Sequence, residues 1–109
     1  MAVVAVYDEF QVLRKTLGQM LESAGHRAVV CESVKEMARG LTQGEFDLVL
    51  VEAKDGYPLL KQHRDVPVIM MAGYLTDFIE NTLYELGAAK VIGMPFDFGK
   101  MRETIGSLV

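Results

Sequence analysis

Short runs of β-prone apolar residues alternate with stretches of helical periodicity along the whole chain. The runs occupy residues 3–7, 27–31, 48–51, 66–71 and 89–94. Several of them are apolar at every position, which is typical of strands covered on both faces in a parallel sheet. Parallel neighbours need crossover connections, and right-handed crossovers place helices on both sides of the sheet. The alternation therefore predicts an α/β fold with a doubly wound, five-stranded parallel sheet.

Each stretch between the runs has an apolar face and recognisable ends. In the first helix, Leu13 begins an apolar stripe and Gly25 provides a stop. Ser33 can cap the second helix, with Glu36 three residues later completing a capping box. A short third helix extends to about His63. The last two helices follow polar residues that can cap their first turns, namely Thr76 or Asp77, and Asp97.

Length, charge and cysteine content narrow the class of protein. The chain has 109 residues, so we expect a single domain over residues 1–109. Its net charge is -4 and no basic residues cluster, which argues against direct nucleic-acid binding. The apolar runs are too short to cross a membrane, and we expect a cytoplasmic protein. The single cysteine, Cys31, excludes an internal disulfide and is expected in the core.

Chemistry in such folds is concentrated at one edge of the sheet. Ligands of doubly wound sheets bind beyond the carboxyl ends of the strands. The segments to examine are therefore residues 7–10, 52–56, 72–76 and 94–96.

These segments resemble the receiver domains of two-component response regulators, the CheY-like family. Residues 3–9 resemble the first strand with its acidic cluster, and residues 46–52 resemble the third strand, which ends in the phosphorylated aspartate. Residues 55–56 resemble the Asp-Gly pair that opens the third helix, and residues 66–72 and 86–96 resemble the last two strands. The resemblance covers nearly the whole chain and implies the strand order 2-1-3-4-5.

The resemblance also implies a role for each position of the family's phosphorylation site. The phosphoacceptor position holds Glu52, which is one methylene longer than aspartate and displaces the carboxylate from in-line geometry. Of the two acids that hold Mg²⁺, one is retained as Asp8, with Glu9 beside it. Asp55 is acidic as well, but it is interpreted as a turn residue before Gly56.

At the other positions of the family's site, the resemblance implies that the functional side chains have been replaced. Tyr7 replaces the first acid, Ala72 replaces the hydroxyl residue, and Met94 replaces the lysine that neutralises the phosphoryl group. Val91 replaces the aromatic residue that rotates on activation, and the loop after Glu52 is shortened. These changes predict a degenerate receiver that is not an enzyme, has no cofactor or catalytic residue, and binds Mg²⁺ weakly or not at all.

Glu52 has two interpretations. Its longer arm could imitate a phosphorylated aspartate, or it could be an ordinary, partly solvated carboxylate that is hydrogen-bonded to Tyr7 or to loop amides. We favour the second and predict a hydrogen bond between Tyr7 and Glu52. The bond between Met94 and Pro95 resembles one that is usually cis in the family, and we expect it to be cis.

A receiver without phosphorylation chemistry would act through its surface. In the family, the fourth helix, fifth strand and fifth helix form a face for dimerisation and for partners. We expect a protein partner or a homodimer at this face, and an output domain of a transcriptional regulator is a candidate neighbour in the same polypeptide. The candidate interface residues are Phe78, Tyr84, Lys90, Val91, Lys100 and Arg102.

Two other functions remain as alternatives. One is an active receiver that is phosphorylated on Glu52 or Asp55, with Mg²⁺ held by Asp8. The other is a flavodoxin-like binder of small ligands, which would need a glycine-rich turn after the first strand. Residues 7–11 contain no glycine and include two acids, which disfavours phosphate binding there.

Overall fold

The strands form one parallel sheet. The computed structural model describes residues 1–62 and 65–109. All neighbouring strands are parallel, in the order β2-β1-β3-β4-β5. The strands are β1 (Val3–Tyr7), β2 (Arg27–Val30), β3 (Leu48–Glu52), β4 (Val68–Ala72) and β5 (Lys90–Gly93). The prediction of a doubly wound sheet with the order 2-1-3-4-5 is therefore confirmed, with strand ends that differ from the predicted ones by one or two residues.

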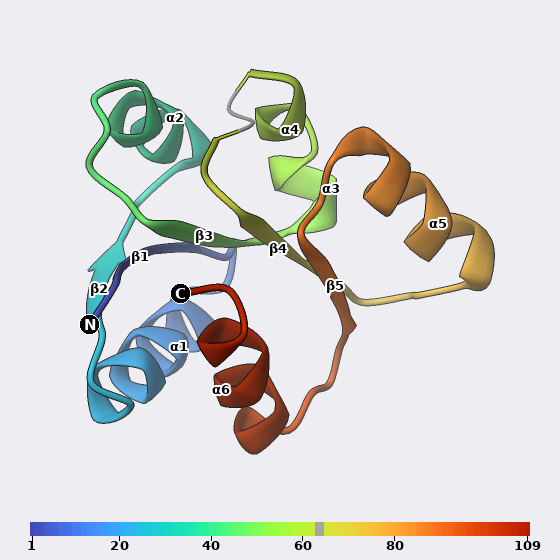
Figure 1. The fold of residues 1–109 in the computed structure, drawn as a ribbon. Helices are drawn as coiled ribbons and strands as arrows, with labels where there is room; N and C mark the ends of the chain where they lie inside the picture. The colour runs from blue at the N-terminus through green and yellow to red at the C-terminus, as the bar shows by residue number, and fades with distance from the viewer. Residues whose placement is uncertain (63–64) are drawn as a thin grey trace.

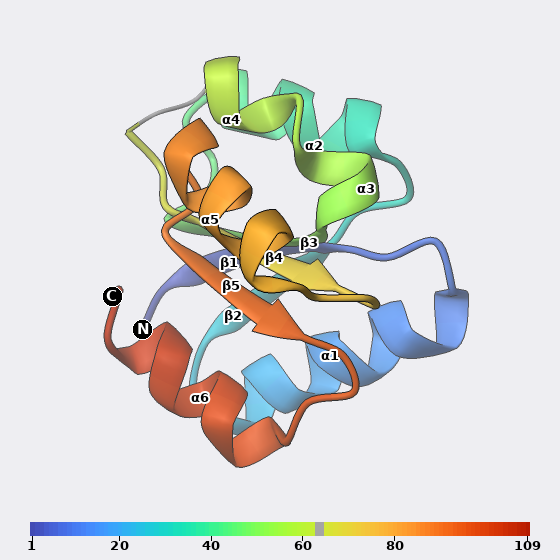
Figure 2. The ribbon, with the colours of Figure 1, turned by 90° about the vertical axis from the view of Figure 1, so that its right-hand side faces the viewer.

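The helices cover both faces of the sheet (Figures 1 and 2). On one face lie α1 (Gln11–Ser23) and α6 (Phe98–Gly106). On the other lie α2 (Val34–Thr42), α3 (Ala53–Gly56), α4 (Leu59–Gln62) and α5 (Asp77–Leu86). Among the described residues, no helix is long and apolar enough to span a membrane.

The third predicted helix is divided into α3 and α4. The break contains Pro58, which has no N–H to donate to a carbonyl one turn back. The predicted end near His63 lies outside the described residues. As a result, a helix of only four residues, α3, follows Glu52 directly.

Each strand contributes side chains to two separate hydrophobic cores, because successive side chains point to opposite faces of the sheet. In β3, Leu48 and Leu50 pack towards α1 and α6, whereas Val49 and Val51 pack towards α2 to α5. All four are fully buried. Cys31 is buried in the second of these cores, as predicted, and burial is the main reason why the pKa of its thiol rises to about 11.

The predicted helix caps are present. The Ser33 hydroxyl accepts a hydrogen bond from the Glu36 N–H (3.0 Å), and the Asp97 carboxylate accepts one from the Lys100 N–H (2.9 Å). Of the two candidates for α5, Thr76 is the cap and accepts from the Ile79 N–H. These caps set where the helices begin after the carboxyl ends of the strands.

Helix side chains protect both edges of the sheet. The outer strand β2 has an N–H at Ala28 that donates to the Glu22 carboxylate of α1 (2.9 Å). The outer strand β5 has an N–H at Val91 that donates to the Tyr84 hydroxyl of α5 (3.1 Å). Unpaired edge groups would otherwise be a template for pairing with another chain. Tyr84 therefore joins α5 to the edge of the sheet.

We expect Tyr84→Phe to lower the free energy of unfolding by about 0.5–1.5 kcal/mol, the usual contribution of one hydrogen bond. The ring stays, so the loss reports the hydroxyl alone. Denaturant unfolding measures the change, and amide exchange at Val91 should accelerate. Tyr57→Phe is the matched control, because Tyr57 is exposed and its hydroxyl makes no hydrogen bond among the described residues. Equal effects of the two substitutions would contradict the assignment.

Candidate functional site

Three carboxylates meet near the carboxyl ends of β1 and β3. Asp8 follows β1, Glu52 is the last residue of β3, and Asp55 lies in α3. Asp8 is fully buried, and its Oδ1 accepts a hydrogen bond from the Phe10 N–H (2.9 Å). The negative charges of Asp8 and Asp55 both act on the pKa of Glu52. The structure thus brings together the acidic residues that the sequence singled out at this edge.

Some oxygen atoms of these carboxylates have no hydrogen-bond donor among the described residues. Asp8 Oδ2, Glu52 Oε2 and Asp55 Oδ2 are buried, and none accepts a hydrogen bond from a described residue. The neighbouring cation, Lys54, forms an ion pair with Glu9, and this hydrogen bond is the main cause of its raised pKa. Among the described residues, Lys54 forms its ion pair with Glu9 and not with Asp8, Glu52 or Asp55.

Burial and the negative charges of neighbouring carboxylates both raise the pKa of Glu52. Burial is the larger reason why the pKa of Glu52 lies above its ordinary value of 4.5, and the charge of Asp8 raises it further. Lys54 opposes the shift. The fold therefore makes the charged form of Glu52 less favourable than it is in a free glutamate.

We expect Glu52→Gln to raise the free energy of unfolding at neutral pH. Because the folded-state pKa of Glu52 is raised, the stabilisation associated with its protonation is present below the ordinary value of 4.5 and is lost as pH rises through the folded-state pKa. The substituted amide would carry no charge at any pH, so the advantage of the variant should shrink as pH falls towards 4.5. Denaturant unfolding over a pH series measures this, with Glu85→Gln on the exposed part of α5 as the control. A difference that does not depend on pH would contradict it.

The predicted hydrogen bond between Tyr7 and Glu52 is wrong. Glu52 Oε2 has no partner, and the Tyr7 ring instead lies 5.6 Å from the Arg14 guanidinium carbon. Arg14 is only 9% exposed and donates a long hydrogen bond to the Glu32 carbonyl (3.4 Å). The pairing follows from the position of Arg14 on the buried face of α1, where its cation packs on an aromatic ring.

Sequence reasoning missed Arg14. The signal was its spacing, because Arg14 stands three residues before Leu17 and seven before Leu21, both of which are fully buried. A charged residue on the apolar face of a helix indicates a specific partner.

Ala72 and Met94, which the resemblance assigns to the family's hydroxyl and lysine positions, have side chains without a hydroxyl or a charge. Ala72 ends β4 and is 6% exposed. Met94 follows β5 and its side chain packs against the α1 and α6 core. The bond between Met94 and Pro95 is cis, as predicted.

The remaining acids are a poor set for Mg²⁺. Magnesium prefers octahedral oxygen ligands, and Tyr7 offers a phenol in place of a carboxylate. Among the residues that the structure describes, no three Asp, Glu, His or Cys side chains are arranged to hold a metal ion. Tyr7 therefore takes away one of the carboxylate ligands that the resemblance implies for Mg²⁺.

A cavity opens beside Glu52 at the same edge. Its volume is about 330 Å³, and it lies between the start of α3 and the start of α5. Its walls are mostly apolar, and its lining residues are Glu52, Ala53, Lys54, Met71, Ala72, Gly73, Tyr74 and Ile79.

The candidate interaction face is exposed except at one position. Phe78, Tyr84, Lys90, Lys100 and Arg102 are exposed, as predicted. Val91 is only 9% exposed and packs in the core beside Leu83 of α5, so its assignment to the surface was wrong. The reason is that alternate residues of β5 face opposite helix layers, and Val91 faces α5.

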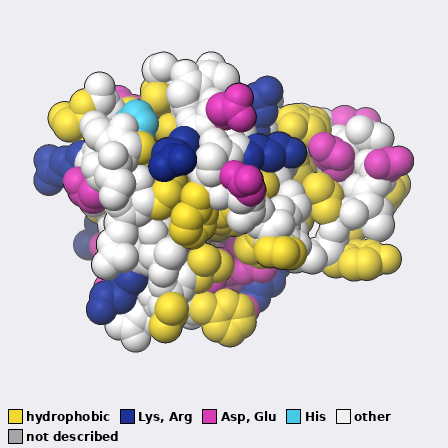
Figure 3. Space-filling view, turned by 90° about the horizontal axis from the view of Figure 1, so that it is seen from below, with side chains coloured by type: hydrophobic (Ala, Val, Ile, Leu, Met, Phe, Trp, Pro, Cys, Tyr) yellow, Lys and Arg dark blue, Asp and Glu magenta, His cyan; other side chains and the backbone are white. Residues whose placement is uncertain are grey.

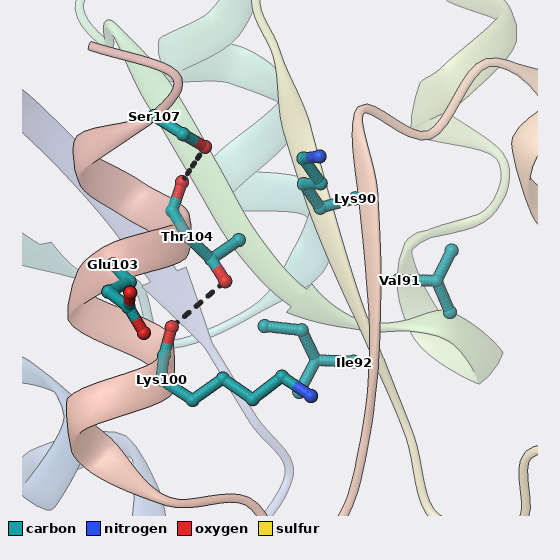
Figure 4. Close-up of a pocket in the computed structure, with 7 residues that line it drawn as sticks. All are labelled: Lys90, Val91, Ile92, Lys100, Glu103, Thr104 and Ser107. Carbon is teal, nitrogen blue, oxygen red and sulfur yellow. Dashed lines mark hydrogen bonds between the residues drawn. The ribbon is translucent and has the colours of Figure 1, made fainter.

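A groove between β5 and α6 forms part of this face (Figure 4). Lys90 and Lys100 lie on its two sides, and the Val91 side chain points away from α6. Sequence reasoning missed Glu103, Thr104 and Ser107, which follow Lys100 at helical spacing and line the groove with it. On the side of α1 and α6, hydrophobic side chains form several patches separated by charged ones (Figure 3).

Comparisons with known proteins agree with this architecture. The family profile described as "Response regulator receiver domain" matches residues 4–106. The DNA-binding transcriptional regulator NtrC of Bradyrhizobium sp. (strain RP501 Parasponia) is 29% identical, over 94% of this chain and 23% of NtrC. The sensory/regulatory protein RpfC of Xanthomonas campestris is 23% identical, over 94% of this chain and 16% of RpfC. The chain therefore spans less than a quarter of the length of these relatives.

Solved structures share the fold. The receiver domain of the Francisella response regulator 1452 superposes with a TM-score of 0.92 at 19% identity, over 99% of this chain and 96% of that chain. NtrX from Brucella abortus, in complex with ADP, superposes with a TM-score of 0.86 at 22% identity, over 98% of this chain and 26% of that chain. Because the family profile matches almost the whole sequence and the strand order agrees, the chain belongs to the family of response regulator receiver domains of two-component systems.

Proposed function

We propose that this chain is a degenerate receiver that acts without phosphorylation, as a protein-interaction module in signal transduction. The observation that carries the proposal is that Ala72 lines the cavity beside Glu52, while Met94 follows β5 and packs against the core under α1 and α6. Transfer of a phosphoryl group requires positioned donors and cations that stabilise the equatorial oxygens. Neither Ala72 nor Met94 can supply one.

Two further features support the loss of signalling by phosphate. The short helix α3 begins immediately after Glu52, so the longer loop that frames the family's pocket is absent at this point. Val91 is buried and β-branched, and its N–H is held by Tyr84. No aromatic side chain at this position can rotate to report a change in the pocket.

The proposed site of interaction is the surface of α5, β5 and α6. Its exposed residues Phe78, Tyr84, Lys90, Lys100 and Arg102 combine aromatic and basic side chains, which are common anchors in interfaces. The partner would be another protein or a second copy of the chain. Recognition through this face does not depend on the acidic pocket.

The context of the domain is also a proposal. We infer that residues 1–109 fold as one domain in the cytoplasm and that an output domain acts with it, because the regulator NtrC is more than four times as long as the matched region. The net charge of -4 argues against direct contact of this domain with nucleic acid.

The test is incubation of the protein with acetyl phosphate and Mg²⁺, followed by intact-mass measurement. We expect no phosphoryl adduct. A stoichiometric adduct would overturn the proposal and favour an active receiver. In that case Glu52→Gln and Asp55→Asn would identify the acceptor, because only loss of the true acceptor abolishes the adduct.

A further inference from the structure

The cavity beside Glu52 has the form of a binding site for a side chain with an apolar stem and a cationic end. Met71, Ala72 and Ile79 contribute apolar walls, and Tyr74 contributes an aromatic ring. Glu52 and Lys54 are the charged residues that line this cavity, and Lys54 forms an ion pair with Glu9, so Glu52 is the charged group without an ion-pair partner among the described residues. The volume of about 330 Å³ is at the small end of ordinary ligand pockets.

A second observation points to a missing donor. Asp8 is not among the lining residues of the cavity, but it is fully buried, its Oδ2 accepts no hydrogen bond from a described residue, and its negative charge raises the pKa of Glu52. Glu52 Oε2 is also buried and accepts no hydrogen bond from a described residue. Buried acceptors without donors are costly, so a donor that arrives from outside gains free energy that an exposed carboxylate would not provide.

Guanidinium suits this environment better than ammonium. It is planar, carries five N–H donors in a fixed fork that matches a carboxylate, and is weakly hydrated. Its flat face can stack on Tyr74, and the methylene stem can lie along Met71 and Ile79. An ammonium group is compact and strongly hydrated, so it loses more on entering an apolar cavity.

We propose that this cavity receives an arginine side chain of a partner protein, with the guanidinium bound to Glu52. The inference rests on the proposed function, because a phosphoryl group on Glu52 would occupy the same place. It differs from that proposal in using the former phosphorylation pocket itself, in addition to the face of α5, β5 and α6.

Exposed aromatic residues at this edge of the sheet favour a protein as the source of the arginine. Tyr74 is 80% exposed, Phe78 is 78% exposed, and Phe10 is 63% exposed. All three follow carboxyl ends of strands, at the edge of the sheet that holds Glu52. Exposed aromatic groups around a polar centre are typical of protein interfaces. The partner segment is therefore expected to carry an arginine flanked by apolar residues.

The test is a titration of isotope-labelled protein with the peptide acetyl-Leu-Arg-Phe-amide, monitored by backbone amide chemical shifts. The matched control peptide has citrulline, a neutral analogue of arginine, at the central position. We expect saturable shifts at Glu52, Lys54 and Tyr74, and binding that is weaker by about tenfold or more for the citrulline peptide. Glu52→Gln should weaken binding of the arginine peptide similarly, whereas Glu85→Gln should not.

Three results would overturn the inference: no saturable shifts at these residues, equal binding of the two peptides, or equal binding by Glu52→Gln. If free arginine amide binds as tightly as the peptide, a small molecule rather than a protein is the source, and the inference of a protein partner is wrong. The acetyl phosphate assay separates the two proposals. A phosphoryl adduct on Glu52 would contradict both the proposed function and the arginine site. If no adduct forms and no arginine peptide binds at Glu52, only the arginine site is contradicted.

Discussion

Replacing Leu50 with alanine is expected to lower the free energy of unfolding by about 2–5 kcal/mol. Leu50 lies in the middle of β3, pairs with Val6 on one side and Ile69 on the other, and is fully buried in the core under α1 and α6. Truncation removes buried methyl groups and leaves a cavity that rigid neighbouring strands cannot close. Urea or thermal unfolding measures the loss.

Val12→Ala is the control for Leu50→Ala. Val12 is in α1 but is 79% exposed, so its truncation should change the free energy of unfolding by no more than about 0.5 kcal/mol. Comparable losses for the two variants would show that Leu50 is not in a close-packed core. The comparison therefore reports on the packing beneath β3, the strand that presents Glu52.

Replacing Gly56 with alanine is expected to cost about 1–3 kcal/mol through overpacking. Gly56 lies in the short helix α3, and a β-carbon there would collide with the side chain of Val51. Val51 is fully buried, so α3 would have to move away from β3. The amide shifts of Glu52 and Ala53 should change with the loss of stability, because both residues connect the strand to this helix.

A double-mutant cycle isolates the contact between Gly56 and Val51. In the Val51→Ala background, Gly56→Ala should cost much less than in the wild type, since the colliding methyl groups are gone. Gly106→Ala is the matched control, because nothing lies near a β-carbon there and alanine in a helix should gain up to about 1 kcal/mol. Additive effects of the substitutions at residues 51 and 56 would contradict the close approach.

The acidic site was predictable in its members but not in its contacts. The sequence indicated that Asp8, Glu52 and Asp55 follow strands, and parallel strands bring their carboxyl ends to one edge. The hydrogen bond between Tyr7 and Glu52 could not be judged in this way. The structure has no such bond, and the Tyr7 ring instead packs with the buried cation of Arg14 on α1.

The interaction face shows a similar division. The exposure of Lys90, Lys100 and Arg102 follows from charge alone, since charged side chains are rarely buried without a partner. Val91 was misplaced because its resemblance to a switch position says nothing about which layer it faces. The register of β5 against β4 decides that, and it pairs Val91 with Met70 in the core of α2 to α5.

Local periodicity was enough to predict the α/β class and the parallel strand pattern, because these are properties of short segments. The assignment of Ala72 and Met94 to hydroxyl and lysine positions came from the family resemblance and stays a prediction. Three features of the site required the folded chain: α3 follows Glu52 directly, a cavity opens beside Glu52, and carboxylate oxygens there have no donor among the residues that the structure describes. These features depend on distances between segments far apart in the chain, which are set by the packing of the whole fold.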